Sequence, residues 1–135
     1  MANRFTRWLH AGFAALFAAG VVVQAYLAGA ALVQLGGGGD FGTHIEFGYT
    51  GMGILALGVL VTAFAARVPR SQVGLAVGLF VLYIVQTVLP NFRGSSPVVA
   101  ALHPANALLL FGLAVVTTRR AVRLTAIEVP AAEMR

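Results

Sequence analysis

Cysteine and lysine are both absent from this chain of 135 residues, and only 4 residues are acidic. Without cysteine the chain can form no disulfide, iron–sulfur cluster, covalently attached c-type haem or thiol nucleophile. Charged side chains make up 10% of the sequence, whereas soluble domains carry about 25%. The composition therefore excludes an ordinary soluble domain and indicates a chain that lies in lipid.

Four long runs contain no charged residue, namely 11–39, 47–66, 71–92 and 94–118. About 20 apolar residues are enough for a helix to cross the hydrocarbon core of a bilayer. The first run is too long for the apolar region of a signal peptide, so we expect it to be a retained span. The sequence predicts an all-α, up-down four-helix membrane bundle in one domain, residues 1–123. Its spans cover about 5–35, 44–66, 71–89 and 97–118, and a short tail follows at 124–135.

Arginine accounts for all nine basic residues, and its distribution sets the expected orientation. Eight arginines flank the first span, the second connection and the end of the fourth span, whereas Arg93 lies in the third connection. The positive-inside rule then places both termini in the cytoplasm, and the Ala, Gly, Val and Arg bias indicates a bacterial inner membrane. A net charge of +5 thus reflects orientation in the lipid bilayer rather than binding to nucleic acid.

The segment Leu102-His103-Pro104 opens the fourth apolar run. Polar groups inside a membrane are costly and usually face the bundle interior, where they have a function. Pro104 cannot donate to the Ala100 carbonyl and should bend the helix, which either shapes the bundle or aims His103.

A second histidine opens the second span. His44, Gly48, Gly51, Leu55 and Gly58 follow steps of four, three, four and three, so a regular helix places them on one face. This glycine face predicts either close helix packing or a flat groove for a planar ligand beneath His44.

The residue that caps the second span stays open. Thr43 with Glu46 fits a capping box, whereas Asp40 as the cap places His44 deeper in the helix.

The up-down order of the spans places two of the three histidines on the same side of the membrane. Spans two and four both enter from the outer face, so His44 and His103 share a leaflet. His10 lies near the inner surface, where we expect an interfacial residue in contact with water, about a bilayer away from the other two. Two imidazoles without other strong ligands favour bis-histidine ligation of one haem b, and they fit zinc poorly. Further expected haem contacts are Gln24, Gln86, Tyr26, Arg93 and Asn106. Gln24 could instead bond to another helix, Arg93 could be a solvated loop residue, and an interhelical bond is favoured for Asn106.

The motifs around these residues carry a resemblance. Gln24-x-x-Leu27-Ala28-Gly29, His44-x-x-x-Gly48 and Leu102-His103-Pro104-x-Asn106-Ala107 resemble an uncharacterised family of small bacterial four-span proteins. More distantly, the layout is similar to one four-helix half of haem A synthase, which implies His44 and His103 as axial ligands. Phe41 stands where that enzyme has a glutamate, and only one half is present, so the resemblance implies haem binding rather than haem oxidation.

Three functions follow from these observations. The first is a small membrane cytochrome b that exchanges electrons with a quinol or a partner protein, or that only holds or senses haem; it needs no catalytic residue of its own. The second is a haem-free accessory subunit, in which the two histidines make interhelical bonds. The third is a transporter or channel subunit, which the lack of acidic residues within spans disfavours.

Gly74 and Gly78 form a G-x-x-x-G pair, typical of a close contact inside the bundle or in a homodimer.

Overall fold

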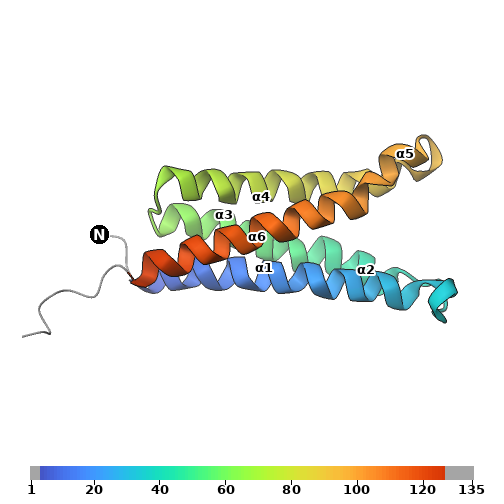
Figure 1. Cartoon of the computed structure of the whole chain (residues 1–135), viewed down its shortest axis with the longest axis horizontal. Coiled ribbons are helices and arrows are strands. Elements are labelled where there is room, and N and C mark those ends of the chain that lie inside the picture. The colour runs from blue at the N-terminus through green and yellow to red at the C-terminus, as the bar shows by residue number, and fades with distance from the viewer. Residues whose placement is uncertain (1–3, 127–135) are drawn as a thin grey trace, which may run out of the picture.

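The computed structural model describes residues 4–126, and these residues form four helical spans (Figure 1). Span 1 is α1 (Arg4–Ala31), which is followed by the 3-10 turn η1 (Val33–Leu35). Span 2 joins α2 (Gly42–Glu46), the π-helical turn η2 (Phe47–Gly51) and α3 (Met52–Ala65). Span 3 is α4 (Arg70–Val88) with the 3-10 helix η3 (Leu89–Gly94), and span 4 is α5 (Pro97–Ala100) with α6 (Leu102–Ala126).

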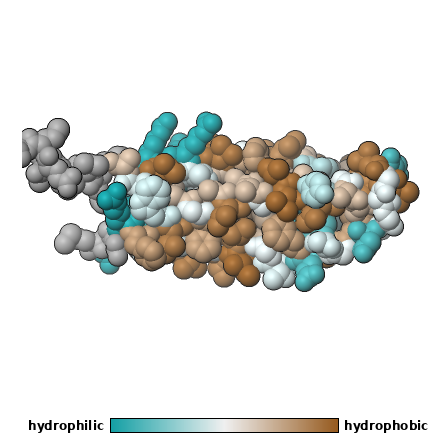
Figure 2. All heavy atoms as spheres, turned by 90° about the horizontal axis from the view of Figure 1, so that it is seen from below, coloured by the Kyte–Doolittle hydropathy of each residue, from teal (hydrophilic) through white to brown (hydrophobic). Residues whose placement is uncertain are grey.

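All four spans are long and apolar enough to cross a membrane, with ranges Arg4–Ala31, Gly42–Ala65, Arg70–Gly94 and Pro97–Ala126. The predicted all-α, four-span fold class is therefore confirmed. Arg4, the connection at 66–69 and Ala126 lie at one end of the bundle, which we call the terminal end (Figure 1). The connections at 32–41 and 89–101 lie at the other end, the distal end. On the face drawn in Figure 2, brown apolar side chains dominate the middle.

The ends of two spans differ from the sequence prediction. Helix α6 continues to Ala126 instead of stopping near 118, because arginine forms helices well and a charge that ends a membrane segment does not end a helix. Predicted tail residues 124–126 are thus helical, and 127–135 lie outside the described residues. A break at Ala101 separates α5 from α6, three residues before Pro104, where a bend was expected.

Span 2 begins with neither of the two N-cap residues that the sequence suggested, Asp40 and Thr43. The helix begins at Gly42, and its N-cap residue Phe41 makes no side-chain bond to the backbone. Asp40 instead accepts a hydrogen bond from the Gly42 amide through Oδ1 at 2.7 Å, as in an Asx turn. Thr43 lies inside the first turn, so the predicted capping box does not form.

The four spans form a closed ring. Helix α1 packs against α3 and α6, and α4 packs against the same two helices. Spans 2 and 4 therefore face each other across the diagonal of the bundle. Alanines form much of the core, with Ala14, Ala56, Ala63, Ala76 and Ala114 fully buried around Phe17 and Leu79. Small side chains let the helix backbones approach closely, as in other membrane bundles.

Gly58 is one place where close approach requires glycine, and it yields a first prediction. A Cβ atom there would overlap the Phe13 ring of α1, whereas a Cβ at Gly74 would meet no atom within 4 Å. We expect Gly58→Ala to lower the free energy of unfolding by about 1–3 kcal/mol through overpacking. Gly74→Ala should leave it unchanged or raise it by up to about 1 kcal/mol. Unfolding in mixed detergent and SDS micelles measures both, and equal stabilities of the two variants would contradict the packing.

Candidate functional site

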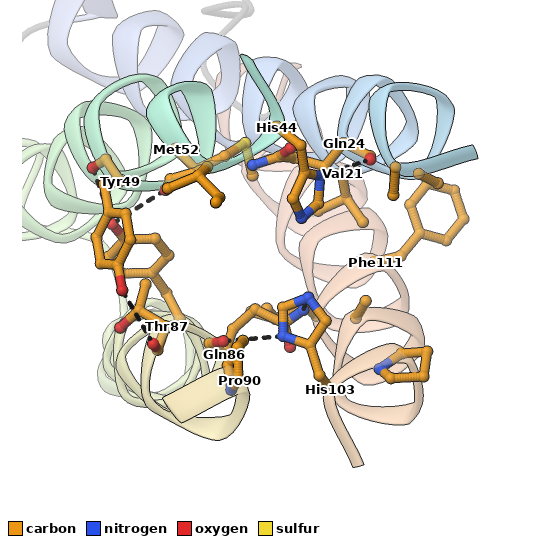
Figure 3. A pocket seen from close by; sticks show the side chains of 18 of the residues that line it. Val21, Gln24, His44, Tyr49, Met52, Gln86, Thr87, Pro90, His103 and Phe111 are labelled. Atoms are coloured by element: carbon orange, nitrogen blue, oxygen red, sulfur yellow. Dashed lines mark hydrogen bonds between the residues drawn. The ribbon is translucent and has the colours of Figure 1, made fainter. Parts of the chain in front are cut away.

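A cavity of about 1090 Å³ occupies the distal half of the bundle. Its volume slightly exceeds the usual range for ligand pockets, about 300–1,000 Å³. All four spans contribute to its wall, which is mostly apolar; among the lining residues are Phe17, Val21, Gln24, His44, Gly48, Tyr49, Met52, Tyr83, Gln86, Thr87, Arg93, His103, Ala107, Leu110 and Phe111. Figure 3 shows several of these side chains around the open space.

His44 and His103 lie across from one another in this cavity, as Figure 3 shows. Their ring centroids are 6.2 Å apart, and the ring planes are inclined by 74°. Span 2 supplies one ring and span 4 the other, so the pair bridges the diagonal of the bundle. The predicted proximity of the two side chains is thus present in the structure.

Each imidazole is held by a backbone carbonyl of a neighbouring span. His44 Nδ1 donates to the Gln24 carbonyl at 3.1 Å, and His103 Nδ1 donates to the Gln86 carbonyl at 3.0 Å. A carbonyl only accepts, so the proton of each neutral ring resides on Nδ1. Both Nε2 atoms therefore keep the lone pair with which an imidazole accepts a hydrogen bond or binds a metal.

Gln86 and Asn106 form a hydrogen-bonded chain behind His103. The Gln86 side-chain amide donates to His103 Nε2 at 3.2 Å. Its Oε1 accepts from Asn106 Nδ2 at 2.7 Å, and Asn106 also donates to the Leu82 carbonyl at 3.0 Å. Asn106 is buried and lies behind Gln86 rather than among the lining residues. Its described bonds are interhelical, the alternative that the sequence left open.

Gln24 and Gly48 line the cavity as predicted from the sequence. Gln24 Oε1 is buried without a hydrogen-bond partner among the described residues, so it is free to accept from a bound molecule. A Cβ at Gly48 would lie 2.6 Å from the Gln24 amide nitrogen. Glycine at this position therefore leaves room for the Gln24 side chain beside His44.

Gly51 does not line the cavity; the Phe47 ring covers it, since a Cβ there would lie 2.5 Å from that ring. The single glycine face expected from a regular helix is interrupted because η2 is a π-helical turn. Met52, which directly follows this turn, lines the cavity. A periodicity of 3.6 residues cannot reveal such a turn, and Met52 had no other signal in the sequence.

Arg93 lies in η3 at the distal end, where it is exposed and contributes to the cavity wall. Tyr26 is exposed on α1 and does not reach the cavity. Two tyrosines that sequence reasoning missed do line it. Tyr49 donates to the Thr87 carbonyl at 3.3 Å, and Tyr83 donates to carbonyls of span 2. Their only sequence signal was a phenol in an apolar run, which usually finds a hydrogen-bond partner when buried.

His10 corrects one expectation, because it is completely buried rather than in contact with water at an interface. Its Nδ1 donates to Thr62 Oγ1 at 3.2 Å, while Thr62 donates to the Gly58 carbonyl. Gln72 Nε2 donates to His10 Nε2 at 3.1 Å and to the Thr117 carbonyl at 2.9 Å. This polar cluster (His10, Thr62, Gln72 and the Thr117 carbonyl) joins all four spans. These partners of His10 could not be predicted from the sequence, because each one comes from a different helix.

Within residues 4–126, no three histidine or acidic side chains gather closely enough to hold a metal ion. Two imidazoles are the strong donors in the cavity, so a metal bound there would need further ligands from a molecule that accompanies it.

Comparison with known proteins gives one match. Residues 24–92, just over half of the chain, match the model of a family described as a family of unknown function (DUF6220). Gln24, His44, Gly48 and Gln86 fall inside the matched segment, and His103 falls outside it. Neither the curated proteins nor the solved structures contain a match.

Proposed function

Since the chain belongs to this family of unknown function (DUF6220), we propose its function from the cavity itself: it is a small membrane b-type cytochrome. His44 and His103 would hold the iron of one haem b between spans 2 and 4. The observation that carries the proposal is the pair of imidazoles facing each other across a large, mostly apolar cavity.

The donor geometry supports this ligation. Bonds from a metal to imidazole nitrogen are about 2.0–2.1 Å long, so two rings on opposite sides of one ion have centres roughly 6 Å apart. The centroids of His44 and His103 are 6.2 Å apart. Histidines that bind metals usually donate their other N–H to a carbonyl or carboxylate, which fixes the tautomer and the ring orientation, and both rings do so here.

Other lining residues suit the remaining parts of a haem. Gln86 would withdraw its amide from His103 Nε2 when that nitrogen binds iron, and the freed amide could then donate to a propionate. Arg93 at the distal mouth supplies a positive charge for the same groups. Phe17, Met52 and Leu110 are buried and keep the middle of the cavity dry. A haem held by both histidines would supply one-electron transfer.

The orientation of the protein in the membrane is proposed from the arginine distribution. We place both termini in the cytoplasm of a bacterium and the distal end at the outer face of its inner membrane. The haem then lies near that face, where a quinol or a redox partner protein can exchange electrons with it. The distant similarity to one half of haem A synthase is consistent with histidines at the outer starts of the second and fourth spans.

A haem titration of the purified protein tests the proposal. We expect one haem per chain, a Soret band and sharp α and β bands after reduction. Ala107 lines the cavity, whereas Ala105 lies outside it on the same helix and is exposed. Ala107→Trp should place an indole in the cavity beside the histidines' helix and lower haem affinity by about tenfold or more, a loss of at least about 1.4 kcal/mol. Ala105→Trp should bind haem as the wild type does. Equal binding by both variants would place the haem elsewhere.

One observation favours a haem-free accessory subunit as the second candidate. The Gln86 amide already satisfies His103 Nε2, and Asn106 satisfies Gln86 Oε1, so this network can serve helix packing without a cofactor. In that case the protein purifies colourless from haem-replete cells, takes up no haem on titration, and migrates with a companion protein on native gels.

A further inference from the structure

The turn η2 interrupts span 2 just after His44. The Met52 amide donates to the Phe47 carbonyl, five residues back, whereas an α-helix bonds residues four apart. Such π turns are rare, accommodate one additional residue and are frequent at functional sites. Each residue of an α-helix turns the chain by about 100°. The additional residue therefore sets how α2, which carries His44, is rotated relative to α3.

The turn η2 lies in the wall of the cavity. Span 2 lines the cavity both before the turn, with His44 and Ile45, and within it, with Gly48 and Tyr49. Met52, which closes the turn, lines it as well. With the lower part of the span fixed by the packing of α3 against α1 and α4, a regular helix would turn His44 away from His103.

Tyr83 of α4 contacts the π turn directly. Its hydroxyl lies 3.1 Å from the Tyr49 carbonyl and 3.3 Å from the Gly48 carbonyl. Widening a helix weakens the bonds that such carbonyls accept from their own chain, so an outside donor compensates them. Gly53 provides the space, because a Cβ there would lie 2.8 Å from the Tyr83 oxygen.

The Tyr83 ring is itself well anchored. It is buried, 8% exposed, and it packs edge-to-face against Phe17 with centroids 6.5 Å apart. A rigid phenol on span 3 thus presents a fixed donor to the turn in span 2. Among the described hydrogen bonds and ring contacts, none joins Tyr83 to His44 or His103, and its hydroxyl bonds both end on carbonyls of η2.

We propose that Tyr83 is a positioning residue: its hydroxyl bond to the Gly48 and Tyr49 carbonyls keeps η2 in the π form and thereby aims His44 at His103. The inference rests on the proposed function where it concerns haem. Loss of the hydroxyl lets span 2 sample a regular helix, in which His44 leaves the cavity.

Label distances test the rotation without any haem. The chain has no cysteine, so Thr43→Cys and Leu109→Cys, both at exposed positions outside the cavity wall, can carry nitroxide labels. Deleting Thr50 should convert the turn to α-helix and move the label at 43 by about 8 Å, given a rotation of about 100° on a helix about 10 Å wide. Thr50→Ala should leave the distance unchanged. Tyr83→Phe should add a second distance population, and Tyr26→Phe should not.

Haem spectroscopy tests the consequence. In Tyr83→Phe we expect bound haem with altered low-spin electron paramagnetic resonance signals and a shifted midpoint potential, since the His44 ring is no longer held in one orientation. Tyr26→Phe should match the wild type. Wild-type label distances and haem signals in Tyr83→Phe would overturn the inference. If the wild type takes up no haem, the proposed function fails, while the label distances still decide the role of Tyr83.

Discussion

Replacing either His44 or His103 by alanine should lower the haem content of the purified protein at least about tenfold. Loss of a residue that only hydrogen-bonds a metal ligand typically lowers metal affinity about 10–100-fold, and loss of the ligand itself should have a larger effect. The remaining imidazole holds one axial position only, and the α and β bands of a six-coordinate haem should disappear. Pyridine haemochrome assay and reduced-minus-oxidised spectra measure content and ligation.

A rescue experiment separates ligation from packing. In His103→Gly the missing ring leaves space beside Pro104, so added imidazole should restore the six-coordinate spectrum in proportion to its concentration. A purely structural His103 would give no such dependence, since the haem spectrum would then not depend on an imidazole at this position. An unchanged Soret band in either alanine variant would show that the ligand assignment is wrong.

His10→Ala should lower the free energy of unfolding by about 2–4 kcal/mol, from the cavity left by the ring and from buried donors that lose their partner. Removal of the ring takes the acceptor from the Gln72 amide, whose own Oε1 already lacks a described partner. It also takes the donor from Thr62. The haem titration should be affected far less, because this cluster lies at the terminal end and the cavity at the distal end.

Leu16→Ala on the same helix is the matched control. Leu16 is 58% exposed to the surroundings of the bundle, so its truncation should change the free energy of unfolding by no more than about 0.5 kcal/mol. Unfolding in SDS and detergent mixtures compares the two variants. Similar stabilities would contradict the buried role of His10, and a loss of haem at unchanged stability would instead tie His10 to the cofactor site.

Hydropathy was sufficient to predict four helical spans, because the lack of charge over about 20 residues leaves few alternatives in lipid. The up-down order of the spans was likewise sufficient to predict that His44 and His103 lie at the same end of the bundle, since spans 2 and 4 both begin there. Neither argument depends on side-chain detail, which explains why both transfer from the sequence to the structure.

Local details of the site depended on contacts between spans, and sequence periodicity does not contain them. The glycine series from His44 was expected on one face, but the π turn η2 changes the helical repeat, and the Phe47 ring covers Gly51. His10 is buried because it hydrogen-bonds Thr62 and Gln72, which belong to two other spans. These residues lie beside it only because all four spans pack together. For Asn106 the sequence allowed either a ligand contact or an interhelical bond, and only the position of Gln86 distinguishes them.

The position of His103 in the last span also orders events during synthesis. His44 and its carbonyl partner Gln24 belong to spans 1 and 2, whereas His103 and its partner Gln86 belong to spans 4 and 3. A ribosome that has inserted residues 1–96 has delivered only one imidazole of the pair. The two histidines therefore come together only when the final helix has entered the membrane, and under the proposed function haem would bind only after that step.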